Sequence, residues 1–427
     1  MPTAAEHLHN AIAAHNAGRL TEAEVGYSRV LRRQPNEARA LYGLGLLSYH
    51  SRSRDKGIQY LVRSLQSAPR NGRAWITLGS MYSETGKAPE ALAAYRRATQ
   101  VAPELADGWY NLGICLKREG DFDGAAQQLR RATACPSPSS HAYEALSALY
   151  YERGQLQEAA QTVADWALRE PGNPTAIHMA AAVSSGPAPP RASDAHVRNL
   201  FDAFADGFDR NLQELKYQAP QLVASALRAS SSAASAAPPF DTVLDAGCGT
   251  GLCGPLVRNL CRTLVGVDLS TKMLAHAQRR NCYDELQTAE LGAFMRTRPR
   301  AFDAIVCADT LVYFGDLAEP LAAAHAALRE AGVFVFTVEA PAEAVEAEHR
   351  LEMSGRYSHS EGYLRRILGE SGFDIASIAR KKLREERAAD VEGYLVVADK
   401  SSTSVSWRHS TPRVAGLRYH RPNRRKP

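Results

Sequence analysis

The sequence predicts two parts of different fold class, an N-terminal all-α repeat solenoid and a C-terminal α/β domain with a doubly wound, seven-stranded sheet. Three observations support this division. The first 185 residues repeat with a period of 34, apolar runs alternate with helical stretches from Phe240 onward, and a glycine-rich loop follows the first of those runs. Stacked helix pairs produce the first pattern, and parallel strands joined by helices produce the second.

Four columns of residues recur every 34 positions in the N-terminal part. A proline closes four of five units, each helix of a pair carries one small residue, and a large residue follows at a fixed offset. The prolines are Pro35, Pro69, Pro103 and Pro171, and the large residues are Leu41, Trp75, Trp109 and Tyr143. This pattern resembles the tetratricopeptide repeat and predicts, over 1–185, five helix pairs starting near residues 4, 38, 72, 106 and 140. The stretch Pro174–Val183 is predicted as a capping helix.

Stacked helix pairs build a concave surface, so the repeats predict a groove that binds a protein or peptide partner. Asn111 occupies an inner-helix position at which members of the repeat family clamp a peptide backbone, and Lys117 and Arg118 follow near the turn. The alternative is an array that only packs against the rest of the chain or makes it a dimer.

The glycine-rich loop lies in residues 243–251, Val-Leu-Asp-Ala-Gly-Cys-Gly-Thr-Gly. Glycines at alternate positions let backbone approach a ligand closely, because no Cβ stands in the way. Asp268 follows 17 residues after Gly251, at the end of a second apolar run, where its carboxylate can accept hydrogen bonds from both hydroxyls of a ribose. The spacing differs from the G-x-G-x-x-G of dinucleotide-binding folds. It resembles the class I methyltransferases, which have a Rossmann-like fold and use S-adenosyl-L-methionine.

The resemblance implies a set of cofactor contacts. The loop residues Gly247, Cys248, Gly249 and Gly251 pass under the methionine and ribose, Asp245 orients the loop or faces the ammonium through water, and Asp268 holds the ribose. Apolar side chains flank the adenine, and a carboxylate accepts from its amino group. The residues implied at that end are Leu269, Met273, Glu290 and Leu291, with Glu290 standing where the family has Asp. Asp309, at the end of the fourth strand, is implied beside the methionine.

Residues 186–239 are predicted to contain a linker and a helical lid. Its first residues are rich in Gly and Pro, which disfavour regular structure, and Phe201, Phe204 and Phe208 then recur at helical spacing. The segment resembles the lid that precedes the catalytic domain in bacterial methyltransferases fused to tetratricopeptide repeats, and Tyr217 is the lid residue expected to touch the cofactor or the substrate. A plain packing helix pair is the alternative. The catalytic domain itself is expected over 240–400.

Candidate catalytic residues follow from the same resemblance. The segment Gly355-Arg-Tyr-Ser-His-Ser360 resembles a motif of that family, in which Arg356 is expected to bind an anionic substrate and His359 to act as a general base near neutral pH. A capping or core histidine is the alternative for His359. Tyr313 is a further pocket candidate. The chain lacks Asn-Pro-Pro-Tyr after the fourth strand, which disfavours methylation of exocyclic base amines by that mechanism.

The charge, cysteine content and apolar runs of the chain limit the kinds of partner and site that can be expected. The net charge is +5, but residues 401–427 carry seven basic residues and no acid, and without them the balance is −2. We therefore expect a basic, disordered tail and a catalytic part that does not favour nucleic acid. The seven cysteines show no Cys-x-x-Cys spacing and no apolar run reaches 18 residues, so neither a metal site nor a membrane span is expected, and the protein is interpreted as cytoplasmic.

The sequence therefore predicts an S-adenosylmethionine-dependent methyltransferase with an unidentified acceptor, either a protein or a small molecule, and a repeat array that recruits or orients something. Two alternatives remain open. One is an adaptor protein whose C-terminal domain binds the cofactor without turnover. The other is a nucleic-acid methyltransferase guided by the basic tail, which would show steeply salt-dependent binding that is lost on truncation after Lys400.

Overall fold

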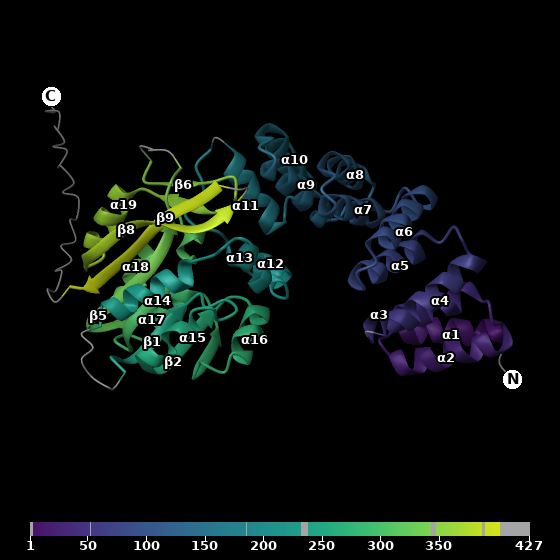
Figure 1. Cartoon of the computed structure of the whole chain (residues 1–427), viewed down its shortest axis with the longest axis horizontal. Coiled ribbons are helices and arrows are strands. Elements are labelled where there is room, and N and C mark those ends of the chain that lie inside the picture. The colour runs from purple at the N-terminus through teal and green to yellow at the C-terminus, as the bar shows by residue number, and fades with distance from the viewer. Residues whose placement is uncertain are drawn as a thin grey trace, which may run out of the picture. The chain divides into compact units, whose positions relative to one another are not determined.

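The computed structural model describes residues 3–51, 53–184, 186–231, 238–342, 347–386 and 389–401, apart from the side chain of His50. The chain divides into two compact units, the first formed by residues 1–187 together with 353–355 and the second by the rest of the chain (Figure 1). The predicted basic tail lies, from residue 402 onward, outside the described residues, as does the centre of the connection before the first strand, 232–237. No helix in the described ranges is both long and apolar enough to cross a membrane.

The N-terminal unit is built from helix pairs (Figure 1). In chain order the helices are α1 Ala4–Asn16, α2 Leu20–Arg33, α3 Ala38–His50, α4 Arg54–Ser67, α5 Gly72–Glu84, α6 Ala88–Val101, α7 Ala106–Arg118, α8 Phe122–Ala134, α9 Ser140–Glu152, α10 Leu156–Arg169 and α11 Pro174–Val183. The first helices of successive pairs begin 34 residues apart, as the proline period predicts, and α11 is the expected additional helix.

The small-residue column sets how closely the two helices of a pair cross. A Cβ added at Gly79 on α5 would lie 2.6 Å from the ring of Tyr95 on α6, and one added at Gly113 on α7 would lie 2.8 Å from Leu129 on α8. Real Cβ atoms do not approach that closely, so a glycine is required where the partner helix presents a large side chain.

The large-residue column joins consecutive pairs. The indole N–H of Trp75 donates to the carbonyl of Pro69 across 2.9 Å, and that of Trp109 donates to Pro103 across 2.8 Å. In each case the tryptophan near the start of a pair satisfies the carbonyl of the proline that closes the previous pair. The sequence columns therefore correspond to repeated contacts, which explains why they keep the same period.

The C-terminal unit begins with three helices, α12 Asp194–Phe204, α13 Phe208–Glu214 and α14 Ala219–Ala229, and continues as an α/β domain. Its strands are β1 Phe240–Ala246, β2 Cys261–Asp268, β3 Glu285–Thr288, β4 Phe302–Cys307, β5 Leu328–Glu339, β6 His349–Leu351, β7 Tyr357–His359, β8 Phe373–Glu386 and β9 Ala389–Lys400. Its later helical elements are α15 Gly254–Val257, η1 Arg258–Leu260, α16 Thr271–Arg279, α17 Leu291–Arg296, η2 Leu311–Tyr313, α18 Ala318–Ala327 and α19 Glu361–Glu370.

The sheet is mixed and doubly wound. Strands β3, β2, β1, β4 and β5 pair in parallel in that order, and β9 then pairs antiparallel with both β5 and β8. The chain order reverses between β1 and β4, and ligands of open α/β sheets bind at the carboxyl ends of strands beside such a switch point. This arrangement confirms the predicted α/β fold class and places the candidate site beside the glycine loop.

The strand count differs from the predicted seven. Nine strands form the sheet in the described residues, because β6 and β7 make a short antiparallel hairpin that joins β5 through a single residue pair, Glu339 and Ser358. Each strand of the hairpin has three residues. A run that short carries too few alternating positions to be detected from the sequence.

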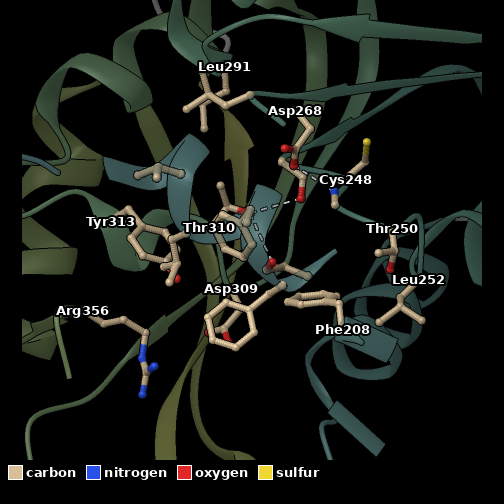
Figure 2. Close-up of a pocket in the computed structure, with 18 of the residues that line it drawn as sticks. Phe208, Cys248, Thr250, Leu252, Asp268, Leu291, Asp309, Thr310, Tyr313 and Arg356 are labelled. Atoms are coloured by element: carbon tan, nitrogen blue, oxygen red, sulfur yellow. Dashed lines mark hydrogen bonds between the residues drawn. The ribbon is translucent and has the colours of Figure 1, made fainter. Parts of the chain in front are cut away.

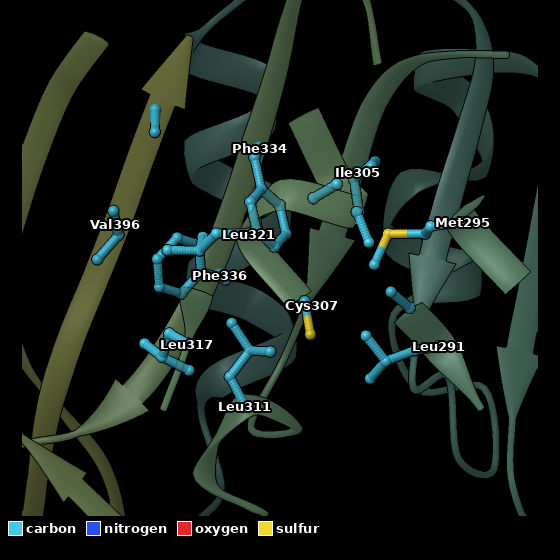
Figure 3. Close-up of a cluster of buried hydrophobic side chains, with 14 of the residues drawn as sticks. Leu291, Met295, Ile305, Cys307, Leu311, Leu317, Leu321, Phe334, Phe336 and Val396 are labelled. Carbon is cyan, nitrogen blue, oxygen red and sulfur yellow. The ribbon is translucent and has the colours of Figure 1, made fainter. Parts of the chain in front are cut away.

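Two apolar layers hold the domain together. Successive strand residues point to opposite faces of the sheet, so Ile305, Phe334 and Phe336 pack on the face covered by α17, α18 and α19 (Figure 3), whereas Val306 and Val335 pack beneath α14. Both faces of the central strands are therefore buried, as parallel sheets require.

Candidate functional site

The glycine loop after β1 has a backbone that other residues rarely adopt. Gly247, Gly249 and Gly251 have φ values of +76°, +55° and +83°. A Cβ on Gly247 would lie 2.3 Å from the Thr310 hydroxyl, whereas one on Gly249 would meet nothing within 4 Å. The N–H groups of Gly247 and Cys248 both donate to the carbonyl of Val267, at 2.8 and 3.0 Å. The loop is thus fastened across the end of β2.

Asp268 completes this connection. Its Oδ2 accepts from the Gly249 N–H across 2.9 Å, and its Oδ1 accepts from the Ser270 N–H across 2.8 Å. Burial raises the pKa of the Asp268 carboxyl, and the backbone N–H groups oppose that shift. Each carboxylate oxygen has two lone pairs, so two backbone donors leave acceptor capacity for a ligand.

A cavity of about 270 Å³ opens at this edge of the sheet. Figure 2 shows Cys248 and Asp268 on one side of it and Tyr313 and Arg356 on the other. The predicted site residues that line it are Tyr217, Gly247, Cys248, Gly249, Asp268, Leu269, Glu290, Leu291, Asp309, Tyr313 and Arg356. The structure therefore brings most of the predicted residues together.

Asp245 and Gly251 do not line this cavity. Asp245 is 1% exposed, and its Oδ2 accepts from the hydroxyl of Tyr283 across 2.6 Å. Burial raises the pKa of Asp245 to about 7, although the hydrogen bond from Tyr283 acts in the opposite direction. Of the two roles expected for Asp245, its position fits orientation of the loop from below.

Two of the residues expected to contact the adenine do not fit that role as predicted. Met273 is fully buried on α16 and does not line the cavity, because its side chain faces the core of the domain. Glu290 lines the cavity but caps α17, where its carboxylate accepts from the N–H groups of Gly292 and Ala293 at 3.0 and 2.7 Å. It also lies 3.2 Å from Arg191. The Glu290 carboxylate is therefore largely engaged by the protein.

The segment over the cavity is fastened to the α/β domain by acidic side chains. Asp209 on α13 accepts from the Thr250 hydroxyl across 2.5 Å and pairs with Arg280. Asp202 on α12 accepts from the Ser270 hydroxyl across 2.5 Å. Both partners, Thr250 and Ser270, adjoin the glycine loop and Asp268 in the sequence. The cavity is thus covered by α12 and α13, with Phe201 and Phe208 on its wall.

The far end of the cavity carries an ionic cluster that sequence reasoning identified only in part. Arg384, on β8, is 2% exposed and pairs with Asp309 across 2.7 Å, with Glu386 across 2.6 Å and with Glu339. Arg356 pairs with Glu339 across 2.5 Å and with Glu386 across 2.7 Å. Arg356 therefore faces carboxylates of the protein, which corrects the expectation that it awaits an anionic substrate.

His359 does not reach the cavity. Its side chain is fully buried, and its Nε2–H donates to the carbonyls of Phe314 and Gly315 at 2.9 and 3.2 Å. Burial, with the neighbouring His349, lowers the pKa of His359 to about 4. The histidine therefore stabilises the turn after η2 and cannot serve as the expected general base, since it touches no ligand-accessible surface.

Arg384 and the acidic fastening of the lid were missed by sequence reasoning. Arg384 stands in a strand rich in charged residues, Lys381-Lys-Leu-Arg-Glu-Glu386, in which nothing singles it out. Asp202 and Asp209 lie on separate helices, α12 and α13, so their spacing in the sequence gave no signal that both would contact the α/β domain. Within the described residues no group of three or more side chains could hold a metal ion.

Sequence profiles of two families match this chain. The profile of a methyltransferase domain matches residues 243–332, from β1 into β5, and the profile of the tetratricopeptide repeat matches residues 8–72, 49–106 and 76–140. No curated protein matches the chain. The chain thus joins tetratricopeptide repeats to a methyltransferase domain.

Several solved structures are similar to a portion of this chain. MamA is 22% identical over 38% of this chain and 94% of its own, with a TM-score of 0.35. The magnesium protoporphyrin IX methyltransferase of Synechocystis PCC 6803, solved with bound S-adenosylmethionine, is 21% identical over 49% of this chain and 97% of its own, with a TM-score of 0.37. A putative S-adenosylmethionine-dependent methyltransferase from Listeria monocytogenes is 18% identical over 42% and 99%, with a TM-score of 0.34.

Proposed function

We propose that the C-terminal unit transfers a methyl group from S-adenosylmethionine to an acceptor, and that the repeat array binds a protein or peptide partner. The observation that carries the first part is the junction of the glycine loop with Asp268 at the edge of one cavity, inside the stretch that matches the methyltransferase profile. The free thiols of all seven cysteines support a reducing compartment, and we extend the proposal to a cytoplasmic location.

The lining residues fit the parts of the cofactor. Asp268 retains lone pairs for the ribose hydroxyls, and Gly249 leaves open space where a side chain would stand. Leu269 and Leu291 supply apolar surface for the adenine ring. Glu290 adds negative charge along the wall, which favours a ligand that carries positive charge.

The protein needs to do little of the chemistry. The bound cofactor supplies a methyl group that is already activated by its sulfonium. The chain must hold the acceptor in line with that methyl and keep water out. The aromatic wall of Phe201, Phe208 and Tyr313 excludes water, and the contacts of Asp202 and Asp209 hold that wall in place.

The repeat array offers a partner surface whose polar groups are partly engaged. The amide of Asn111 donates to the carbonyl of Asp107 across 2.8 Å, Lys117 pairs with Glu152 across 2.7 Å, and Arg118 donates to Ser83 across 3.2 Å. A peptide must exchange these contacts for its own. The proposal of a protein partner therefore rests on the repeat architecture and not on a free clamp residue.

Transfer of labelled methyl from S-adenosylmethionine into a cell extract tests this function. Protein, nucleic-acid and small-molecule fractions would be counted after incubation with the full chain and with Asp268→Ala. Label in protein supports recruitment of the acceptor by the repeats, and label in small molecules alone supports the transferase while leaving the array an assembly role. Label in no fraction would overturn catalysis and favour an adaptor that binds the cofactor without turnover.

A further inference from the structure

One carboxylate oxygen in the cavity wall lacks a partner. Oδ1 of Asp309 is buried and accepts no hydrogen bond in the part of the chain that the structure describes. Oδ2 of the same side chain accepts from Arg384 across 2.7 Å. A buried acceptor without a donor is destabilising, because it has lost its hydrogen bonds to water without replacement. Such an atom beside a candidate active site indicates that a ligand supplies the missing donor.

The backbone holds Asp309 in an unusual position. Its φ is +56°, in the left-handed region, which is strained for residues other than glycine. Its N–H donates to the hydroxyl of Thr337 across 2.9 Å, and Thr337 is fully buried on β5. The carboxylate is therefore fixed from both its backbone and Arg384. Strain of this kind persists at sites where a side chain must be aimed.

The surrounding charge is unbalanced. Asp309, Glu339 and Glu386 contribute three negative charges to the cluster, and Arg356 and Arg384 contribute two positive charges. Both guanidiniums are already bonded to these carboxylates. One further positive charge would neutralise the cluster, whereas an anionic ligand would increase the imbalance.

The wall beside Asp309 is aromatic. Phe201 packs edge-on against Phe208 at 5.9 Å and against Tyr313 at 5.5 Å, measured between ring centroids. Tyr217 lines the same cavity, and Asp309 is among the charges that raise the pKa of its hydroxyl, after burial itself. Figure 2 shows Asp309 between Phe208 and Arg356. Aromatic faces attract cations, so the wall and the cluster favour the same kind of ligand.

We propose that the methyl acceptor is an amine on an apolar body, and that its nitrogen binds the Asp309 carboxylate. This inference rests on the proposed methyltransferase function. Because the surrounding side chains cover Oδ1, binding of the amine requires those side chains to move.

The reaction balances with the groups present. The ammonium of the acceptor gives one proton to the Asp309 carboxylate, and the nitrogen lone pair attacks the methyl carbon. The N–C bond forms, the C–S bond breaks, and its electron pair stays on sulfur, leaving S-adenosylhomocysteine. The proton then passes to solvent when the product leaves. Burial raises the pKa of Asp309 while Arg384 lowers it, so the carboxylate can take up a proton transiently.

The chemical class of the labelled product tests this assignment. Extract labelled with the wild-type chain would be treated with mild alkali and then passed over a cation exchanger. An N-methyl amine survives alkali and stays cationic, whereas a methyl ester releases labelled methanol. Alkali-stable, cation-retained label is the expected result. Release of methanol, or label in neutral ethers, would overturn the amine.

Asp309→Asn separates the acceptor from the cofactor. Asn tolerates a positive φ and can still accept from Arg384, but it presents an amide to the amine. We expect labelling to fall about 100-fold while affinity for S-adenosylhomocysteine changes by less than about 3-fold. The exposed Asp374→Asn is the control. A 10-fold loss of S-adenosylhomocysteine affinity in Asp309→Asn would show that Asp309 serves the cofactor, and would overturn the inference. Absence of label from a wild-type chain that binds S-adenosylhomocysteine would instead overturn the proposed function itself.

Discussion

The Asp268 carboxylate accepts a hydrogen bond from the Gly249 N–H across 2.9 Å, and so joins the end of β2 to the glycine loop that follows β1. The contact makes the loop and the acid one unit. Gly249 needs its positive φ to aim its N–H at the carboxylate, and Asp268 is held from its other oxygen by Ser270. The protein itself therefore holds in place the carboxylate that we propose binds the ribose.

The lid should loosen when Asp209 is removed. Asp209→Ala deletes the contact with the Thr250 hydroxyl and the pair with Arg280. The pair is partly exposed and contributes little, but a hydrogen bond to a charged group contributes about 1.5–3 kcal/mol. We expect dissociation of S-adenosylhomocysteine, followed by stopped flow, to be about 10-fold faster. Glu214→Ala, exposed on the same helix, is the control, and equal rates in both variants would contradict the fastening role.

Gly247 and Gly249 should differ in their tolerance of alanine. Both have positive φ, so each substitution costs about 1–2 kcal/mol of backbone strain. Only the Gly247 Cβ also meets Thr310, at 2.3 Å. We expect Gly247→Ala to lower the free energy of unfolding of the ligand-free domain by at least about 2 kcal/mol more than Gly249→Ala. Equal losses, measured by urea titration, would show that the Thr310 contact is not rigid.

His359 should affect acid stability and not catalysis. Its folded pKa of about 4 lies below the ordinary value of 6.5, so the neutral buried ring stabilises the fold above pH 6.5, and that contribution is lost as the pH falls toward 4. The shift corresponds to about 3 kcal/mol. The stability difference between wild type and His359→Gln should therefore shrink over that window, with methyl transfer per folded molecule retained. A pH-independent difference would contradict the effect on acid stability. Loss of methyl transfer in a folded variant would support His359 as a general base.

Asp245 should behave in the opposite sense. Its folded pKa of about 7 lies above the usual 3.8, so the neutral acid's contribution to stability is complete below pH 3.8 and is lost as the pH rises through 7. The loss amounts to at most about 4 kcal/mol. Asp245→Asn removes the titrating group but can still accept from Tyr283. We expect the melting temperature of this variant, relative to that of the wild type, to rise as the pH is raised from 5 to 8. No relative change would mean that Asp245 is ionised in the folded state throughout.

Most of the fold could be predicted from the sequence, because the patterns that indicate its helices and strands are local and repeated. Trp75 and Trp109 occupy the same column of the repeat and make the same contact in successive pairs. The 34-residue period therefore predicts the helix pairs. The glycine loop and Asp268 likewise lie within one β-α-β stretch. The family resemblance of these residues implied one shared site for them, and the structure joins them through the Gly249 N–H.

Residues whose roles depend on distant pairing could not be predicted in this way. Arg384 reaches Asp309 only because β9 returns beside β5 and brings β8 with it. His359 turns inward because β7 joins the end of β5, and Met273 turns inward because of how α16 packs on the sheet. In each case the side chain's direction is set by tertiary packing, which a motif does not record.

The central claim is that Asp268 and the glycine loop bind S-adenosylmethionine, and titration calorimetry with S-adenosylhomocysteine tests it most directly. We expect the full chain to bind one equivalent and Asp268→Ala to weaken binding by at least about 100-fold, because two charge-assisted hydrogen bonds to the ribose are lost. The surface variant Asp374→Ala should bind as the wild type does, and melting temperatures of both variants verify folding. Equal affinity in wild type and Asp268→Ala, or no binding by the wild type, would contradict the claim.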